Sequence, residues 1–370
     1  MRIAFDSNIF TMQKYGGVSR YIVRLGEELS LLGNEVKVFG WLHKNCHLRD
    51  SRLQSQLRYI DEFPPMTRRI AHHLSDLVAN RQLRNWQPSL IHETFCHDRM
   101  VGSQKTPRVC TIHDLIHQKF PLYRGRLNRI PEYQQSTICR SDAVICVSES
   151  TKQDLSDCFN IEESKIWVVH HGFEHATEMP LLTEAEEVTF ANLKSMPYLL
   201  YVGVRDGYKN FHGFLRALKA SSAHQGIRVV AFGSGPLTPN ELLWIREMGF
   251  KAGDILHSSG SDSLLQALFR YAEAFIYPSI YEGFGFPPLE AMAEDCPVIS
   301  SNTSSMPEVI GDAAEYFDPH SVDSMAQAID SVVGSSGRRS QLIEAGKLRL
   351  KAFSWSKCAA ETLAVYQTIS

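Results

Sequence analysis

Short apolar runs that alternate with longer amphipathic stretches recur along this chain and limit the folds open to it. In the first half the apolar runs cover residues 2–6, 35–39, 89–92, 108–113, 143–147 and 166–169. Runs of this length are typical of buried strands, and a stretch such as 19–32 has helical spacing. The alternation resumes at 198–203 and ends in a helical stretch over 355–369. Strands that alternate with helices predict an α/β fold with doubly wound parallel sheets covered by helices.

The length of the chain predicts two domains. A chain of 370 residues exceeds what one hydrophobic core usually organises. After residue 175 the alternation stops, and 176–196 is polar with little periodicity, which indicates a linker. We therefore expect a first Rossmann-like domain over 1–175 and a second over 197–354.

The composition of the chain argues against several kinds of binding partner. With a net charge of -3 and 21% charged residues, the chain is not expected to bind nucleic acid. No apolar run approaches the roughly 18 residues of a membrane span, and the N-terminal residues resemble a strand rather than a signal peptide. We expect a cytoplasmic protein. Its eight cysteines include no Cys-x-x-Cys pair and no histidine at ligand spacing, which predicts reduced thiols and no metal site.

The charge is distributed unevenly. Residues 44–129 contain 15 Lys and Arg against seven Asp and Glu, so the rest of the chain is acidic. A basic segment interleaved with leucines and aromatics favours contact with an anionic membrane or a lipid-linked diphosphate. A solvated basic surface without a partner is the alternative interpretation.

One stretch, residues 279–293, places two carboxylates around a glycine turn. Glu282 and Glu290 are eight positions apart, and Gly283 and Gly285 between them permit backbone conformations that a side chain forbids. Two prolines follow, and proline suits the first turn of a helix. The stretch predicts strand, tight loop and helix start, where free N–H groups and the helix dipole favour an anion. For Glu290 alone, complementing the dipole of its own helix is an alternative explanation.

Other polar residues follow predicted strands. His113 ends the run over 108–113, and ligands of open α/β sheets bind beyond the carboxyl ends of strands. Arg205 and Lys209 occupy the turn between a strand and the helix predicted over 211–220, where helix dipole and point charge both favour an anion. A hydrogen-bonded structural histidine and inert surface cations are the alternatives. Gly16 and Gly17 form a loop between the first strand and the first helix, but not a dinucleotide-binding or P-loop pattern.

Several of these motifs together resemble one enzyme family. Gly203 at a strand end is followed by Lys209-Asn210, and Gly233 opens a Phe-Gly-Ser-Gly turn. Tyr-Glu-Gly-Phe-Gly-Phe-Pro-Pro-Leu-Glu runs from 281 to 290, and Gly16-Gly17 and His113-Asp114 match the first domain. In this order the motifs resemble the retaining glycosyltransferases of family 4, which have the two-domain GT-B fold with a cleft between the domains. The resemblance also implies that residues 355–370 cross back and pack on the first domain.

The resemblance implies a role for each motif residue. Glu282 would approach the donor sugar, Glu290 would hold the nucleotide ribose, and His113 would contact the sugar near the reacting centre. Arg205 and Lys209 would neutralise the leaving diphosphate. The family often has Arg-Lys-Asn where this chain has Tyr208-Lys209-Asn210, which puts the role of Arg205 in doubt. Backbone contacts to the donor would come from Gly16, Gly17, Gly203, Gly233, Gly283, Phe284, Gly285 and Phe286.

The expected activity follows from this resemblance. A hexose, with mannose from GDP-mannose as the first choice, would pass to a lipid-linked or oligosaccharide acceptor in surface-polysaccharide assembly, without metal or cofactor. The enzyme would be cytoplasmic, with peripheral contact to an anionic membrane. UDP-glucose, UDP-galactose and UDP-GlcNAc are alternative donors. A sugar-nucleotide epimerase, a phosphorylase and a non-catalytic nucleotide-sugar-binding scaffold are alternative functions, and the sequence leaves the oligomeric state open.

Overall fold

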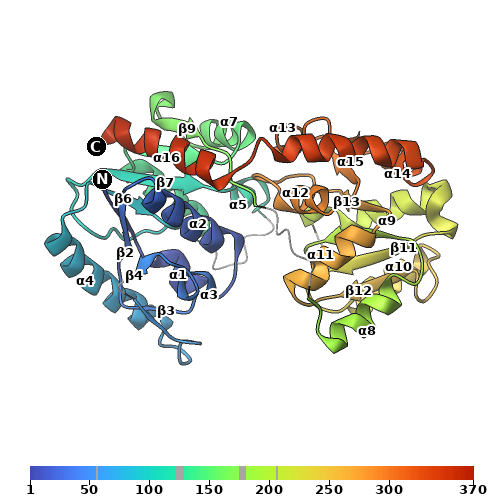
Figure 1. Cartoon of the computed structure of the whole chain (residues 1–370), viewed down its shortest axis with the longest axis horizontal. Coiled ribbons are helices and arrows are strands. Elements are labelled where there is room, and N and C mark those ends of the chain that lie inside the picture. The colour runs from blue at the N-terminus through green and yellow to red at the C-terminus, as the bar shows by residue number, and fades with distance from the viewer. Residues whose placement is uncertain (56, 122–128, 175–180, 206) are drawn as a thin grey trace. The chain divides into compact units, whose positions relative to one another are not determined.

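The chain forms two compact units. The computed structural model describes residues 1–55, 57–121, 129–174, 181–205 and 207–370. One unit contains residues 1–172 with 353–370, and the other contains 173–352. Figure 1 shows the elements of both units, coloured along the chain. Each unit has its own sheet and its own core, as the strand and helix alternation predicts.

The expected linker over 176–196 is wrong in its second half. Helix α8 spans Glu184–Leu193, and it begins with a capping box. The Thr183 hydroxyl accepts from the N–H of Glu186, whose carboxylate accepts from the N–H of Thr183. This Thr-x-x-Glu signal was present in the sequence and outweighs the weak periodicity that followed it. Residues 176–180 lie outside the described part.

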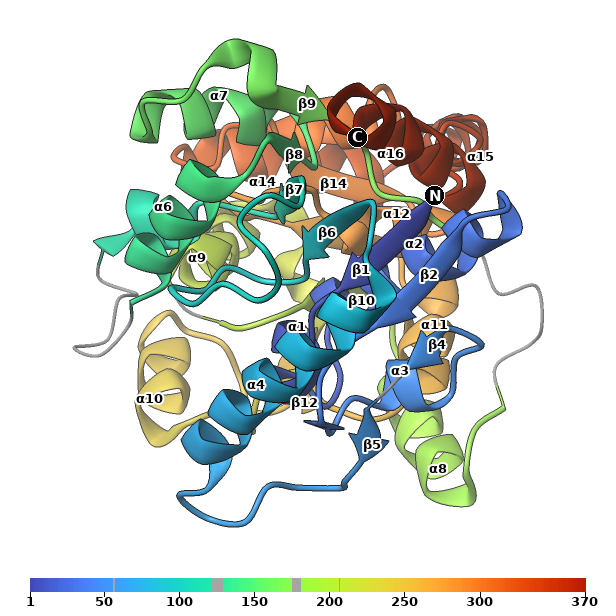
Figure 2. The same cartoon turned by 90° about the vertical axis from the view of Figure 1, so that its left-hand side faces the viewer.

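The first unit is built on a parallel sheet in the order β4-β2-β1-β6-β7-β8-β9, with a separate β3-β5 pair. The strands are β1 (Arg2–Phe5), β2 (Glu35–Val38), β3 (Leu42–His43), β4 (Gln54–Ser55), β5 (Arg58–Tyr59), β6 (Leu90–Glu93), β7 (Arg108–Ile112), β8 (Ala143–Cys146) and β9 (Ile166–Val168). The helices are α1 (Asn8–Met12), α2 (Gly17–Leu31), α3 (Cys46–Arg49), α4 (Arg68–Trp86), α5 (Ile116–Lys119), α6 (Ile130–Arg140), α7 (Glu149–Cys158) and α16 (Trp355–Ile369). Figure 2 shows the elements of this unit in blue to green, with α16 in dark red.

The buried residues 3–5 of strand β1 pack against helices on both faces of the sheet. Ile3 and Phe5 belong to the core cluster that contains α2 and α16, whereas Ala4 belongs to the cluster that contains α4. This alternation follows from the two-residue period of a strand. Because both faces are covered, residues 3–5 of β1 are all apolar, as is typical of parallel sheets.

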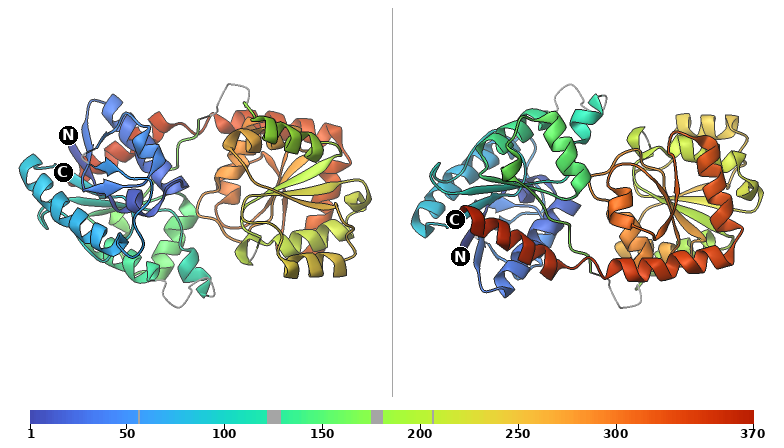
Figure 3. Two further views of the ribbon diagram at one scale, coloured as in Figure 1. Left: turned by 90° about the horizontal axis from the view of Figure 1, so that it is seen from below. Right: turned by 90° about the horizontal axis from the view of Figure 1, so that it is seen from above.

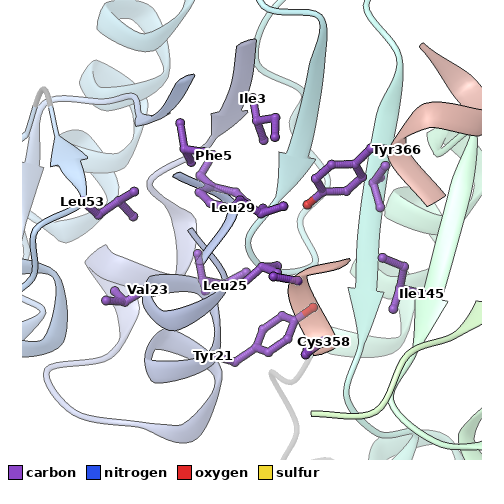
Figure 4. Packing of buried hydrophobic residues seen from close by; sticks show 14 of the residues in the cluster. Ile3, Phe5, Tyr21, Val23, Leu25, Leu29, Leu53, Ile145, Cys358 and Tyr366 are labelled. Atoms are coloured by element: carbon purple, nitrogen blue, oxygen red, sulfur yellow. The ribbon is translucent and has the colours of Figure 1, made fainter. Parts of the chain in front are cut away.

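Helix α16 is anchored to the first unit by a buried polar chain as well as by apolar packing. The Tyr366 hydroxyl lies 2.5 Å from Nδ1 of His92, whose Nε2 lies 3.0 Å from Oγ1 of Thr111. Oγ1 of Thr111 in turn lies 3.2 Å from the Tyr21 hydroxyl of α2. Figure 4 shows Tyr366 and Cys358 of α16 among the core residues of β1 and α2. The predicted return of the last helix to the first domain is confirmed, and His92 is a structural residue.

The second unit is built on a six-stranded parallel sheet in the order β12-β11-β10-β13-β14-β15. Its strands are β10 (Tyr198–Val202), β11 (Arg228–Phe232), β12 (Ile255–Ser258), β13 (Ala274–Tyr277), β14 (Val298–Ser301) and β15 (Ala314–Phe317). Its helices are α8, α9 (Phe211–Ala220), α10 (Pro239–Glu247), α11 (Asp262–Tyr271), α12 (Phe286–Ala293), α13 (Met306–Ile310), α14 (Val322–Val333) and α15 (Ser336–Leu350). Figure 3 shows helices on both faces of the sheet. Helices α9, α10 and α14 share one core cluster, and α12 contacts α11 and α15.

No helix within the described ranges combines the length and apolar character that a membrane span requires.

Tyr366→Phe tests the buried anchor of α16. The substitution removes the hydroxyl that pairs with His92, and a buried polar group without a partner costs about 1–3 kcal/mol. We expect a lower urea midpoint of unfolding. Tyr271→Phe, at a side chain that is 53% exposed, serves as the control and should leave the midpoint unchanged. An unchanged midpoint in Tyr366→Phe would contradict the anchoring role.

Candidate active site

An ion pair joins two loops at the carboxyl edge of the second sheet. Nζ of Lys209 lies 2.6 Å from Oε1 of Glu282. Lys209 follows β10 and Glu282 follows β13, and these two strands are neighbours in the sheet. The strand order reverses between them, because β11 and β12 lie on one side and β14 and β15 on the other. Open α/β sheets bind their ligands at such a reversal, so the structure brings two predicted site residues together at the expected position.

Aromatic rings surround the ammonium group of Lys209. Nζ lies 5.5 Å from the ring centroid of Tyr208 and 5.5 Å from that of Tyr277, within reach of a cation–π attraction. Burial raises the pKa of Tyr277, and the neighbouring Glu282 raises it further, so its hydroxyl stays protonated. Lys209 and Glu282 have side chains only 15% and 10% exposed. In such a poorly solvated place the pair has a stronger electrostatic effect than a surface pair.

The loop after β13 enters helix α12 through a left-handed residue. Gly285 is the N-cap of α12 with φ 100°, and a Cβ there would lie 3.5 Å from the Tyr277 ring. The structure therefore has the predicted order of a strand, a glycine turn and a helix start. Both prolines lie in the first turn of the helix. Phe284 is buried and Phe286 begins the helix, whereas Glu290 lies about one turn farther in.

Side-chain hydroxyls after β14 fix this loop, and sequence reasoning missed them. Ser305 donates to the carbonyl oxygens of Glu282 (2.9 Å) and Phe284 (3.0 Å), and Ser304 donates to that of Glu282 (2.6 Å). Thr303 donates to the carbonyl of Ile280 at 2.9 Å. The signal was a run of small polar residues, 300–305, which begins in the last two positions of β14 and contains hydroxyl residues at every position except Asn302. Nothing in that run names its partners, because they lie about 20 positions away.

Two predicted glycines end the neighbouring strands of the same sheet. Gly203 follows β10 with φ 131°, and Gly233 follows β11 with φ 87°. A Cβ at Gly203 would lie 3.8 Å from Cε of Lys209, and a Cβ at Gly233 would lie 3.9 Å from the amide nitrogen of Gly203. These distances are ordinary contacts, so the backbone conformation is what requires glycine here.

Arg205 does not join the Lys209 pair. Its Nε donates to Oε1 of Glu241 at 2.7 Å, and Nη2 donates to the carbonyl oxygens of Gly235 (2.8 Å) and Pro236 (3.1 Å). These bonds hold the loop after β10 to the start of α10. The expected contact of Arg205 with a diphosphate stays a prediction, and Lys209 is the cation beside Glu282.

His113 lies at the carboxyl edge of the first sheet, against a second histidine. Its ring stacks on His171 with centroids 5.3 Å apart, and Nδ1 lies 3.4 Å from Nε2 of His171. The Tyr21 ring meets both imidazoles edge-on, at 5.1 and 4.7 Å. Burial lowers the pKa of His113 to about 4, so the ring is neutral near pH 7. Among the described residues, Nε2 of His113 has no hydrogen-bond partner.

The predicted glycine loop of the first unit lies near this histidine. Gly16 is the N-cap of α2 and Gly17 is its first residue, and a Cβ at Gly17 would meet nothing within 4 Å. The next residue, Val18, lines a cavity of about 80 Å³ together with His113 and Phe95. Open space at a helix N-terminus leaves backbone N–H groups accessible to an anion.

The described residues include no group of three or more His, Cys, Asp or Glu side chains placed to hold a metal ion. All eight cysteines are free, and Cys139 and Cys158 are the exposed ones.

Ser305→Ala tests whether the hydroxyls hold the loop in its working shape. The substitution removes a buried hydroxyl whose single hydrogen is shared between the carbonyl oxygens of Glu282 and Phe284, an interaction worth about 0.5–1.5 kcal/mol. We expect about a tenfold loss of the transfer activity anticipated from the sequence, because Glu282 loses its fixed position. Ser141→Ala removes a similar hydroxyl-to-carbonyl bond in the first unit and should lower stability only. Equal activity in both variants would contradict the role of Ser305.

Comparisons with known proteins agree with this architecture. The family model described as glycosyl transferases group 1 matches residues 184–349, and that for glycosyltransferase family 4 matches 15–177. The chain is 28% identical over 273 residues to the O-antigen chain mannosyltransferase B of Escherichia coli, covering 70% of each. Sucrose-phosphate synthase from Thermosynechococcus elongatus shares the fold with a TM-score of 0.73 and 18% identity, covering 99% of this chain and 98% of that chain. Anabaena HepE, solved with UDP and glucose, has a TM-score of 0.68 and 15% identity, covering 98% and 99%.

The two matched regions correspond to the two units and carry the motifs that the sequence analysis singled out. The chain belongs to the glycosyltransferases, with a family 4 first domain and a group 1 second domain in the GT-B fold.

Proposed function

We propose that this glycosyltransferase transfers mannose from GDP-mannose to a lipid-linked or oligosaccharide acceptor in surface-polysaccharide assembly. The observation that carries the proposal is the Lys209–Glu282 pair at the strand-order reversal of the second sheet. A nucleotide sugar has a diphosphate beside a hydroxyl-rich ring. The pair offers one cation and one carboxylate at the same place.

Binding of the donor would exchange the partners of this pair. The diphosphate would take Lys209 away from Glu282, and the freed carboxylate would accept hydrogen bonds from the hexose hydroxyls. Lys209 would then stabilise the charge that develops on the leaving nucleoside diphosphate. The N-terminus of α12, which has no side-chain cap, would add its dipole to the same charge. These groups supply the stabilisation without a metal ion, and the family resemblance implies retention of configuration.

Support for the donor comes from the relatives. The Escherichia coli protein at 28% identity is named a mannosyltransferase, which favours mannose. HepE binds UDP and glucose within the same fold, so a UDP-sugar is the second candidate donor. Release of nucleoside diphosphate from a panel of GDP- and UDP-sugars, with acceptor present, would decide between the two.

Two variants test the exchange of partners. Lys209→Ala should lower transfer about a hundredfold or more and weaken GDP binding, because the diphosphate loses its cation. Glu282→Ala should lower transfer to a similar extent but leave GDP binding unchanged or tighter, because Lys209 is no longer neutralised. Lys219→Ala, on the same unit, is the control, since Lys219 donates to the carbonyl of Gly249.

Transfer rates and calorimetric GDP titrations distinguish the outcomes. Near-normal turnover in both variants would show that the Lys209–Glu282 pair is not part of the active site. Weaker GDP binding in Glu282→Ala would contradict the exchange while leaving the site in place.

A lipid-linked acceptor requires a membrane-facing surface, and helix α4 of the first unit is our candidate. Ile70, Leu74 and Leu77 are 63%, 37% and 56% exposed, and their spacing places them on one helical face. Arg81 and Arg84 continue the same face and are exposed. The opposite face is buried against the sheet through Ala79 and Leu83. Figure 2 shows α4 in the foreground.

An apolar stripe that ends in two cations suits the interface of an anionic membrane. We propose peripheral contact at the inner face of the plasma membrane through this α4 stripe. Other cations of the basic segment are less available, because Arg108 is buried with Glu93 and Arg99 pairs with Asp76. Arg124 and Arg126 lie outside the described residues, and so do the side chains of Arg68 and Arg69.

Vesicle sedimentation tests the stripe. The double variant Ile70→Gln with Leu77→Gln should lose most binding to vesicles that contain anionic phospholipid, because the apolar contact is removed. Leu31→Gln, at a leucine of α2 that is 80% exposed, should bind like the unchanged protein. Salt should weaken the binding. The proposal would be contradicted if vesicle binding did not depend on anionic lipid and was the same in the double variant as in the unchanged protein.

A further inference from the structure

The second unit has a cavity whose lining does not include the Lys209–Glu282 pair. Its volume is about 810 Å³, within the range of small-molecule sites. The loop after β10, the start of α9, the start of α10 and the loop after β15 form most of its walls, and Ser234 after β11 and Ile280 after β13 complete them. Neither Lys209, Glu282, Glu290 nor the 283–286 loop lines it. Among the residues expected to contact the donor, Arg205 lines this cavity, so the cavity borders the proposed donor site without including Lys209 or Glu282.

The floor of this cavity includes an uncapped helix start. Asn210 is the N-cap of α9 in the left-handed conformation, with φ 54°, and its side chain makes no capping bond. Instead its Nδ2 donates to the carbonyl of Pro319 at 2.9 Å. The first-turn residues Phe211, His212 and Gly213 line the cavity, and their N–H groups have no partner among the described residues. Free N–H groups at the positive end of a ten-residue helix favour an anion.

Arg205 gives an independent indication of an anionic ligand. The residue is 8% exposed and lines the cavity. Its Nε and Nη2 are bonded to Glu241 and to carbonyl oxygens, whereas Nη1 is buried and has no partner in the described part of the chain. A buried guanidinium nitrogen without an acceptor is costly, and a bound anion would supply that acceptor.

The remaining walls add positive charge and an aromatic surface. Glu241 is the one acidic side chain among the described lining residues, and its carboxylate is bonded to Arg205 and to Thr238. Arg216 is exposed and has no ion pair or hydrogen bond with the described residues. The ring of Trp244 lies 4.9 Å from that of His212 and 6.3 Å from that of Phe211. Cations therefore exceed anions in this lining, beside the partly exposed ring of Trp244, which can cover an organic group.

We propose that this cavity binds a small molecule that carries a phosphate monoester, at a site separate from the donor. The phosphate oxygens would accept hydrogen bonds from the first N–H groups of α9 and from the guanidinium groups of Arg205 and Arg216. The organic part would lie against the partly exposed ring of Trp244. The proposal does not depend on the identity of the transferred sugar or on the role of Lys209.

Calorimetric titration of the intact protein with mannose 6-phosphate tests this site. Arg216→Gln changes an exposed side chain, so the fold should survive, and we expect binding at least tenfold weaker. Lys209→Ala should bind mannose 6-phosphate as the unchanged protein does, and saturating GDP should not displace it. Trp244→Leu should weaken the binding of mannose 6-phosphate more than the binding of inorganic phosphate, because only mannose 6-phosphate has an organic part that can contact the Trp244 ring.

Two results would overturn the proposal. One is the absence of saturable binding to the unchanged protein. The other is binding that Lys209→Ala abolishes, GDP displaces and Arg216→Gln leaves intact, because the phosphate would then occupy the donor site. Failure of the donor-site variants alone would leave this inference standing, so the two proposals fail separately.

Discussion

The Lys209–Glu282 ion pair is the interaction around which the candidate site of the second unit is arranged. Parallel strands bring their carboxyl ends to one edge, and reversal of the strand order leaves an opening between β10 and β13. The pair joins the loops that follow these two strands. Because both side chains are poorly exposed, each charge needs the other until a ligand replaces it. An anion with hydroxyl groups nearby satisfies both charges.

Keeping that pair in place requires a rigid loop, and the loop is rigid for reasons outside itself. Gly285 supplies the left-handed turn into α12, and Ser304 and Ser305 bond the backbone of the loop from a separate strand end. The first unit follows the same logic with different residues. There His113 is set by stacking on His171 and by the edge of Tyr21, whose hydroxyl continues into the buried chain that anchors α16. In both units the candidate residues follow strands and are oriented by residues from other elements of the same unit.

Local patterns predicted much of this structure, and long-range partners account for what was missed. The apolar runs marked β1, β2, β6, β7, β8 and β9, and the glycine and proline pattern marked the turn into α12, because each signal acts within a few residues. The bond of Ser305 to the 282–284 backbone and the pairing of Arg205 with Glu241 join distant segments. One sequence alone does not reveal such partners. Helix α8 was missed for a different reason, since its capping box was present but its periodicity was weak.

The central claim is that a nucleotide-sugar diphosphate binds where Lys209 and Glu282 meet. A crystal structure of the intact protein with bound GDP-mannose, or with the UDP-sugar that it prefers, tests this most directly. We predict phosphate oxygens within hydrogen-bonding distance of Nζ of Lys209, with Glu282 turned from the lysine to the sugar hydroxyls. A diphosphate bound elsewhere, with the Lys209–Glu282 pair still closed at 2.6 Å, would contradict the account.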